Sequence, residues 1–166
     1  MRCGIALGSN LGDRIAHLRA ARTALASLHQ GSGAPLLSPV YETEPVDCEP
    51  GTAPYLNAVM EIESDLDPAA LLHRLQQIER SMGRPSEHLR NAPRTLDLDL
   101  LYAGEMTLQS AELTLPHPRI ATRRFVLQPL ADLHPDLILP GTDRPVASFL
   151  SALPLNPSVQ LWAQPI

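Results

Sequence analysis

Two aspartates separated by a single leucine form the segment best suited to chemistry. Asp97 and Asp99 lie in the run 95–101, in which polar and apolar side chains alternate. Residues two apart in a β-strand point to the same side, so we expect both carboxylates on one face and the intervening leucines in the core. The rise per residue of a strand puts the two aspartates roughly 7 Å apart along the backbone.

Such a pair of like charges on an apolar strand is unfavourable without a counter-charge. A divalent cation would supply it, and hard oxygen ligands favour magnesium. The alternative is an exposed sheet face with ordinary solvated aspartates, although aspartate is disfavoured in strands. Asp97 and Asp99 are therefore candidate magnesium ligands, with the solvated pair left open.

All 13 basic residues of the chain are arginines. P-loop and protein-kinase sites place a lysine on the transferred phosphates, so the lack of lysine excludes both. Arg84 and Arg94 enclose the loop that leads into the aspartate strand, and they could close over a polyphosphate. Alternatively, Arg84 caps the preceding helix and Arg94 forms a plain salt bridge with one of the aspartates.

The composition is that of a globular protein. Its 166 residues suit one domain, and its apolar stretches are shorter than the ~20 residues of a membrane span or than a signal peptide. A net charge of -5 argues against general nucleic-acid binding. Two cysteines are too few for a disulfide framework, which indicates a cytoplasmic location, with Cys3 as a buried free thiol.

The elements that must position the aspartates follow from hydrophobic periodicity. We expect Ser9 or Asn10 to cap the first helix, and Asp67 to cap the second with Pro68 at its first position. Residues 106–108 are a candidate hairpin partner of the aspartate strand. The expected strands cover 2–7, 36–43, 55–64 and 95–102, and the expected helices cover 11–29, 67–83, 121–133 and 146–153.

The order strand, helix, strand, strand, helix, strand predicts an α+β fold with a ferredoxin-like βαββαβ core. In this arrangement helices flank an antiparallel sheet. The same fold also hosts RNA binders and regulatory domains, so it does not define the function.

Aromatic residues make up only 4% of the chain, and two of them stand next to loops. Tyr55 and Phe125 could sandwich a flat heterocycle, with Asn57 supplying amide hydrogen bonds. Each aromatic could equally be a core residue. His117, held between two prolines, is more often structural in such a setting.

Four motifs occur in a characteristic order: Gly-Ser-Asn-Leu-Gly at 8–12, Tyr-Leu-Asn-Ala at 55–58, Ala-Pro-Arg-Thr-Leu-Asp-Leu-Asp at 92–99 and Leu-Pro-His-Pro-Arg at 115–119. With these motifs the chain resembles the 6-hydroxymethyl-7,8-dihydropterin pyrophosphokinases of folate biosynthesis. The resemblance covers nearly the whole chain and is weakest after about residue 135. It implies transfer of the β,γ-diphosphate of ATP to the pterin hydroxymethyl group, with release of AMP.

The resemblance also implies roles for individual residues. Asp97 and Asp99 would bind two Mg²⁺ ions, and Arg84 and Arg94 would be the catalytic arginines. The residues expected to contact the pterin are Thr43, Val46, Tyr55, Asn57 and Phe125. Those expected to contact ATP are Gln76, Glu79, Arg84, Arg94, Leu100, Thr114, His117 and Arg123.

The chain departs from the family's pattern at four positions, one of which is Pro118, where some members carry an aromatic residue. Many members carry an aromatic residue where Asn91 stands, and some carry basic residues at the positions of Ser86 and Glu112. These differences concern closure of the loop and nucleotide affinity rather than the chemistry.

Two other functions stay open from the sequence. A different D-x-D metal-dependent transferase would share the metal pair without needing the aromatic residues. A non-catalytic ferredoxin-like ligand-binding module would tolerate loss of either aspartate. For the pyrophosphokinase we expect small-molecule substrates, a monomer, and no nucleic-acid or membrane partner.

Overall fold

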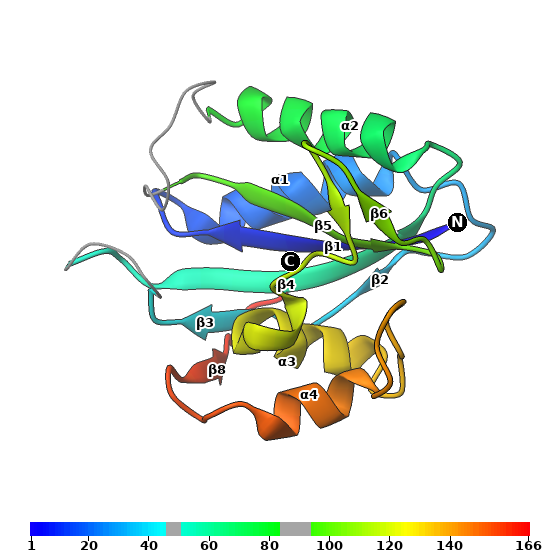
Figure 1. The fold of residues 1–166 in the computed structure, drawn as a ribbon. Coiled ribbons are helices and arrows are strands. Elements are labelled where there is room, and N and C mark those ends of the chain that lie inside the picture. Colours follow the sequence, from blue (N-terminus) through cyan, green and yellow to red (C-terminus); the bar gives the residue numbers. More distant parts are fainter. Residues whose placement is uncertain (46–50, 84–93) are drawn as a thin grey trace.

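An antiparallel sheet with helices on both faces forms the molecule (Figure 1). The computed structural model describes residues 1–45, 51–83 and 94–166. The strand order is β5-β1-β4-β3-β8, and β2 also pairs with β4. The strands of this sheet are β1 Arg2–Ser9, β2 Leu36–Leu37, β3 Tyr41–Thr43, β4 Tyr55–Glu63, β5 Asp97–Ala103 and β8 Val159–Leu161.

Helices α1 and α2 cover one face of the sheet, and α3 covers the other, with α4 packed against α3 (Figure 1). The order β1, α1, β3, β4, α2, β5, with β5-β1-β4-β3 as neighbours, confirms the predicted ferredoxin-like fold. A short 3₁₀ helix, Ile120–Thr122, precedes α3. The four α-helices are α1 Arg14–Ala26, α2 Pro68–Ser81, α3 Arg124–Leu133 and α4 Val146–Ala152.

The central strand β4 is buried on both sides. Its apolar side chains Leu56 and Met60 belong to the core under α1 and α2, whereas Val59 belongs to the core under α3 and α4. The polar residues Asn57 and Glu61 are therefore buried too. Their alternation with apolar residues is typical of a half-exposed strand, but α3 covers the side that would otherwise face water.

The second helix begins and ends as predicted. The Asp67 carboxylate accepts a hydrogen bond from the Ala70 N–H at 3.0 Å, and Pro68 occupies the first turn. Gly83 follows with a φ of +90°, a conformation that favours glycine.

The predicted N-cap of the first helix is wrong. The helix begins at Arg14, and its cap is Asp13, whose carboxylate accepts from the Ala16 N–H at 3.1 Å. Ser9 and Asn10 are instead buried next to β5 and the loops around the site.

Two strand predictions also need correction. The expected strand over 36–43 is split into β2 and β3. The Ser38 hydroxyl, and not a backbone carbonyl, accepts the hydrogen bond from the Val59 N–H, and Pro39 has no N–H to donate. The expected partner of the aspartate strand at 106–108 is not its partner, since β6 (Leu108–Gln109) pairs with β7 (Thr114–Leu115) in a separate small sheet. Strand β8 was not expected at all.

Cys3 is fully buried as a free thiol, as expected, and burial raises its pKa to about 11. Cys48 lies outside the described residues. Within the described part of the chain, no helix has the length and apolar character needed to cross a membrane.

A contact between β1 and β5 gives a test of this packing. A Cβ atom at Gly4 would lie 2.2 Å from Cε1 of the buried Tyr102 ring. We expect Gly4→Ala to lower the free energy of unfolding by about 1–3 kcal/mol, because the ring must shift within a packed core. Urea unfolding measures this, with Gly33→Ala as the control, since a Cβ there meets no atom within 4 Å. Equal unfolding midpoints for Gly4→Ala and wild type would contradict the packing described.

Candidate active site

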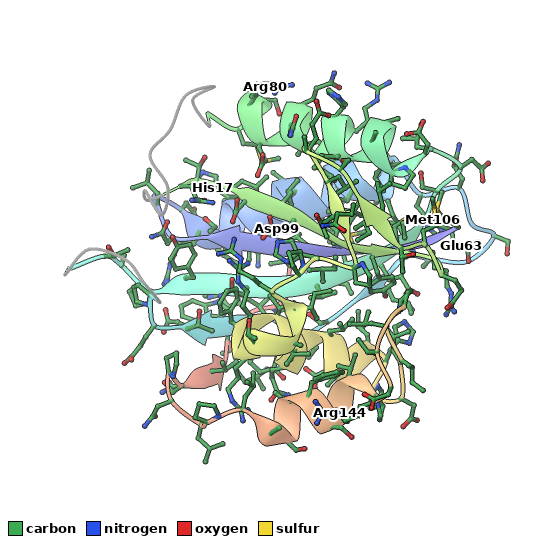
Figure 2. The ribbon with its side chains drawn as sticks, viewed as in Figure 1. His17, Glu63, Arg80, Asp99, Met106 and Arg144 are labelled. Atoms are coloured by element: carbon green, nitrogen blue, oxygen red, sulfur yellow. The ribbon has the colours of Figure 1, made fainter. Side chains whose placement is uncertain are left out.

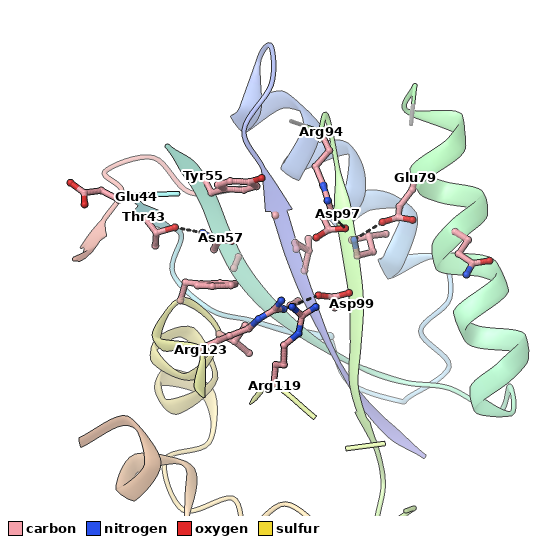
Figure 3. A pocket seen from close by; sticks show the side chains of 18 of the residues that line it. Thr43, Glu44, Tyr55, Asn57, Glu79, Arg94, Asp97, Asp99, Arg119 and Arg123 are labelled. Atoms are coloured by element: carbon pink, nitrogen blue, oxygen red, sulfur yellow. Dashed lines mark hydrogen bonds and ion pairs between the residues drawn. The ribbon is translucent and has the colours of Figure 1, made fainter. Parts of the chain in front are cut away.

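A cavity of about 490 Å³ opens beside the ends of β1, β4 and β5, bordered by α2 and the first turn of α3 (Figure 3). Its volume is in the range of sites for small molecules. It brings together most of the predicted site residues: Thr43, Tyr55, Asn57, Gln76, Glu79, Arg94, Asp97, Asp99, Arg123 and Phe125.

The two aspartates of β5 face this cavity together, as the strand periodicity predicts. The leucines that alternate with them are 0%, 4% and 2% exposed at Leu96, Leu98 and Leu100. Burial of these leucines on the opposite face therefore fixes which way Asp97 and Asp99 point.

Each aspartate is paired with an arginine. Nη1 of Arg94 lies 2.7 Å from Oδ1 of Asp97, and Nη1 of Arg123 lies 3.4 Å from Oδ2 of Asp99. Burial opposes the charge of Arg94, but the carboxylates of Asp97 and Asp99 outweigh it and raise its pKa. The salt bridge that the sequence analysis gave as an alternative role of Arg94 is thus present in the structure.

Asn10 fixes the backbone of Arg94 from two sides. Oδ1 of Asn10 accepts the Arg94 N–H at 2.8 Å, and the Asn10 N–H donates to the Arg94 carbonyl at 3.2 Å. Nearby, the Thr95 hydroxyl donates to the Met82 carbonyl at 2.9 Å. These bonds anchor the chain that enters β5 to β1 and to the end of α2.

Glu79 occupies the free edge of β5. Glu79 is 5% exposed, and its carboxylate accepts the Leu98 N–H at 2.8 Å. Because β5 is the last strand on this side of the sheet, that N–H has no strand partner. Glu79 and Gln76 place α2 along one wall of the cavity.

The opposite wall carries the aromatic pair. Tyr55 opens β4 and Phe125 lies in the first turn of α3, and both line the cavity. The amide of Asn57 donates to the Thr43 hydroxyl at 2.7 Å, which orients that amide between the two strands. The structure thus brings the described candidate pterin residues together.

Several predicted nucleotide contacts do not line this cavity. Leu100 is in the core, Thr114 belongs to β7, and the His117 N–H donates to the Leu101 carbonyl at 2.7 Å. Burial lowers the pKa of His117 despite the opposing charge of nearby Asp99. Val46 and Arg84 lie outside the described residues, as do Ser86 and Asn91.

Sequence reasoning missed Arg119, which also lines the cavity. Its place as the last residue of the Leu-Pro-His-Pro-Arg motif was the available signal. Gly8 was assigned only to a turn, yet it lies in β1 where a Cβ would come within 3.3 Å of Oδ1 of Asn57. The small size of Gly8 therefore helps keep the floor of the cavity open.

The carboxylates suit a metal that arrives with a substrate. Among residues 1–45, 51–83 and 94–166, no group of three or more His, Cys, Asp or Glu side chains could hold a metal ion. Magnesium commonly binds through one or two carboxylates together with substrate phosphates and water. Asp97 and Asp99 fit that pattern and not a cage made by the protein alone.

A carboxylate pair with arginine counter-charges, on a ferredoxin-like sheet, suits an enzyme that transfers a phosphate group from a nucleotide. Residues 4–135 match the family described as 7,8-dihydro-6-hydroxymethylpterin-pyrophosphokinase (HPPK), and the chain belongs to that family. It is accordingly an enzyme of the diphosphotransferase class. The non-catalytic module and the other D-x-D transferases are set aside by this membership.

Curated relatives agree with this family. The 2-amino-4-hydroxy-6-hydroxymethyldihydropteridine pyrophosphokinase of Bacillus subtilis is 45% identical over 131 residues, which cover 78% of this chain and 75% of the relative. The Pseudomonas aeruginosa protein of the same name is 41% identical over 156 residues, covering 93% of each chain.

Longer proteins contain a similar region. A crystal structure described as HPPK-DHPS in complex with substrates matches 91% of this chain and 43% of its own, with a TM-score of 0.72 and 13% identity. At that identity the match supports the fold alone. The folic acid synthesis protein fol1 of Schizosaccharomyces pombe is 40% identical, and the match spans 90% of this chain and 20% of that protein.

The anchoring of Arg94 can be tested through Asn10. We expect Asn10→Ala to lower kcat/KM on the order of 100-fold, since small displacements of a positioning group can cost that much. Steady-state AMP formation measures the loss, and a circular-dichroism melt verifies that the variant is folded. Gln109→Ala, at an exposed position of β6, is the control. A folded Asn10→Ala variant with unchanged kcat/KM would show that Arg94 is held without Asn10.

Proposed function

We propose that the chain transfers the β,γ-diphosphate of ATP to the hydroxymethyl group of 6-hydroxymethyl-7,8-dihydropterin, releasing AMP, as a step of folate biosynthesis. The hydroxyl oxygen of the pterin bonds to the β-phosphorus and loses its proton, and the bond from that phosphorus to the α,β-bridging oxygen breaks. The observation that carries this proposal is the arginine-paired Asp97 and Asp99 within the cavity of a chain from this family.

The pterin would lie between Tyr55 and Phe125. A flat heterocycle gains stacking contacts from two aromatic rings, and both rings belong to the wall of one cavity. Thr43 and Asn57, already hydrogen-bonded to each other, present polar atoms for the ring edge. Val46 stays a proposed further contact, outside the described residues.

ATP would occupy the rest of the cleft, from β5 towards α2. Gln76 and Glu79 line that wall, and Arg94 and Arg123, which line the same cavity, would bind the phosphates. His117 lies close enough to Asp99 for its pKa to be affected. Leu100 and Thr114 would contact the nucleotide beyond the cavity, and Arg84 would join Arg94 as the second catalytic arginine.

Asp97 and Asp99 would hold two magnesium ions. When bound, these ions would neutralise phosphate charge and make the attacking hydroxyl more acidic. Arg94 and Arg123 would then be released from the carboxylates and could donate to phosphate oxygens, for which a guanidinium is well suited. Arg94 would stabilise the negative charge that develops as AMP departs.

We further propose that residues 1–166 form one pyrophosphokinase domain, working as a cytoplasmic monomer. Its substrates are small molecules, and the net charge of -5 argues against a nucleic-acid partner. Dependence on ATP and the buried free thiol of Cys3 support a location in the cytoplasm.

Product analysis tests the reaction. With ATP, Mg²⁺ and the reduced pterin we expect AMP, and Asp97→Asn should lower turnover by at least about 100-fold because a charge-stabilising ligand is lost. Chromatographic separation of AMP from ADP is the measurement. Asp143→Asn, whose parent side chain is 93% exposed, is the charge-matched control. Formation of ADP would contradict diphosphate transfer, and full activity of Asp97→Asn would contradict the metal role.

A further inference from the structure

Three arginines line the cavity within the described part of the chain: Arg94, Arg119 and Arg123. Two of them are neutralised by the aspartates of β5. For Arg119, no ion pair with a carboxylate occurs among the described residues, and these include Glu44, which lines the same cavity. Within the part of the chain that the structure describes, Arg119 therefore lines the cleft without a salt bridge of its own.

Arg119 lies beside other cationic groups. Figure 3 shows its side chain and that of Arg123 directed to the same carboxylate, Asp99. The pKa of Arg123 is lowered, first by burial and next by the charge of Arg119, in spite of Asp99. One carboxylate thus faces two guanidinium groups, and this end of the cleft has an excess of positive charge.

Arg119 is also an exposed residue. It lines a second cavity of about 500 Å³, next to the first, which shares Arg123 and Phe125 with it. Arg124 borders that second cavity too, but its guanidinium donates to the backbone carbonyls of Leu150, Leu153 and Pro154. Arg124 is therefore a structural residue, whereas the donors of Arg119 are available to a ligand.

We propose that Arg119 is a further nucleotide-binding residue, whose guanidinium binds the polyphosphate chain beside Arg123 at the Asp99 end of the cleft. The inference rests on the proposed function, which brings a polyanion to this place. A guanidinium can form two parallel hydrogen bonds to phosphate oxygens and remains charged at all physiological pH values.

If Arg119 binds the polyphosphate, its charge affects the stability of the protein differently with and without bound nucleotide. Without nucleotide, the repulsion between Arg119 and Arg123 offsets the attraction of Arg119 to Asp99, so Arg119 contributes little or nothing to folding stability. With nucleotide bound, the same charge stabilises the complex, because the guanidinium pairs with phosphate oxygens. A residue with a merely structural role would stabilise both states alike.

Arg119→Gln separates these possibilities. We expect its melting temperature without ligand to equal or exceed that of wild type. Its affinity for magnesium α,β-methylene-ATP should fall roughly tenfold, as for loss of one charge-assisted hydrogen bond. Pterin affinity should not change, and in turnover the KM for ATP should rise more than kcat falls. Arg119→Lys keeps the charge but loses the two parallel N–H donors of the guanidinium. It should therefore recover part of the nucleotide affinity.

Arg144→Gln is the control, since it removes the same charge at an exposed position near α4, far from Asp99 (Figure 2). Unchanged nucleotide affinity in Arg119→Gln would overturn the inference, as would a lower melting temperature accompanied by equal losses for nucleotide and pterin. If wild type formed no AMP, the proposed function would fail, while the binding comparison would still decide the role of Arg119.

Discussion

Two carboxylates on one face of β5 impose the constraint on which the cleft depends. Asp97 and Asp99 cannot turn away, because the leucines that alternate with them are buried in the core. Their charges must be neutralised where they stand. Arg94 and Arg123 provide that neutralisation from opposite sides of the cavity. A cation and an anionic substrate that arrive together can replace these pairs without leaving any charge unpaired.

The first turn of α3 links the two halves of the site. Arg123 precedes this helix and contacts Asp99, whereas Phe125 lines the wall where the pterin is proposed to bind. The guanidinium of Arg123 lies 5.4 Å from the centre of the Phe125 ring. Any shift of α3 would therefore disturb both substrate positions at once.

Helix α3 is held in place by apolar and polar contacts with the sheet. Leu127 and Leu130 are buried in the same core as Val59 of β4. At the end of the helix, Nε2 of His134 lies 3.1 Å from the Glu61 carboxylate. A buried polar residue on a central strand is unusual, but Glu61 has a structural role there. It anchors α3, the helix that carries Phe125.

Local patterns were sufficient to predict the four α-helices, the three long strands and the shared face of the aspartates. The period of two in β5 sets the direction of Asp97 and Asp99, and the Asp67-Pro68 cap sets the start of α2. Both features depend on neighbours in the sequence. The family motifs then indicated which distant segments belong together.

Other features depend on contacts between residues far apart in the chain. Asn10 was expected to cap a helix, but it binds the backbone of Arg94, 84 positions away. Burial of both faces of β4 follows from the position of α3, which periodicity within β4 does not reveal. The availability of Arg119 could be recognised only after Arg94 and Arg123 had been matched with their carboxylates.

Metal binding with and without nucleotide tests the central claim most directly. The measurement is a calorimetric titration of Mn²⁺, as a magnesium substitute, into the protein alone and into the protein saturated with α,β-methylene-ATP. We expect tight binding only with the nucleotide, because Arg94 and Arg123 neutralise the two aspartates in the empty cleft. Equally tight binding in the absence of nucleotide would contradict the account, since the aspartates would then form a complete metal site by themselves.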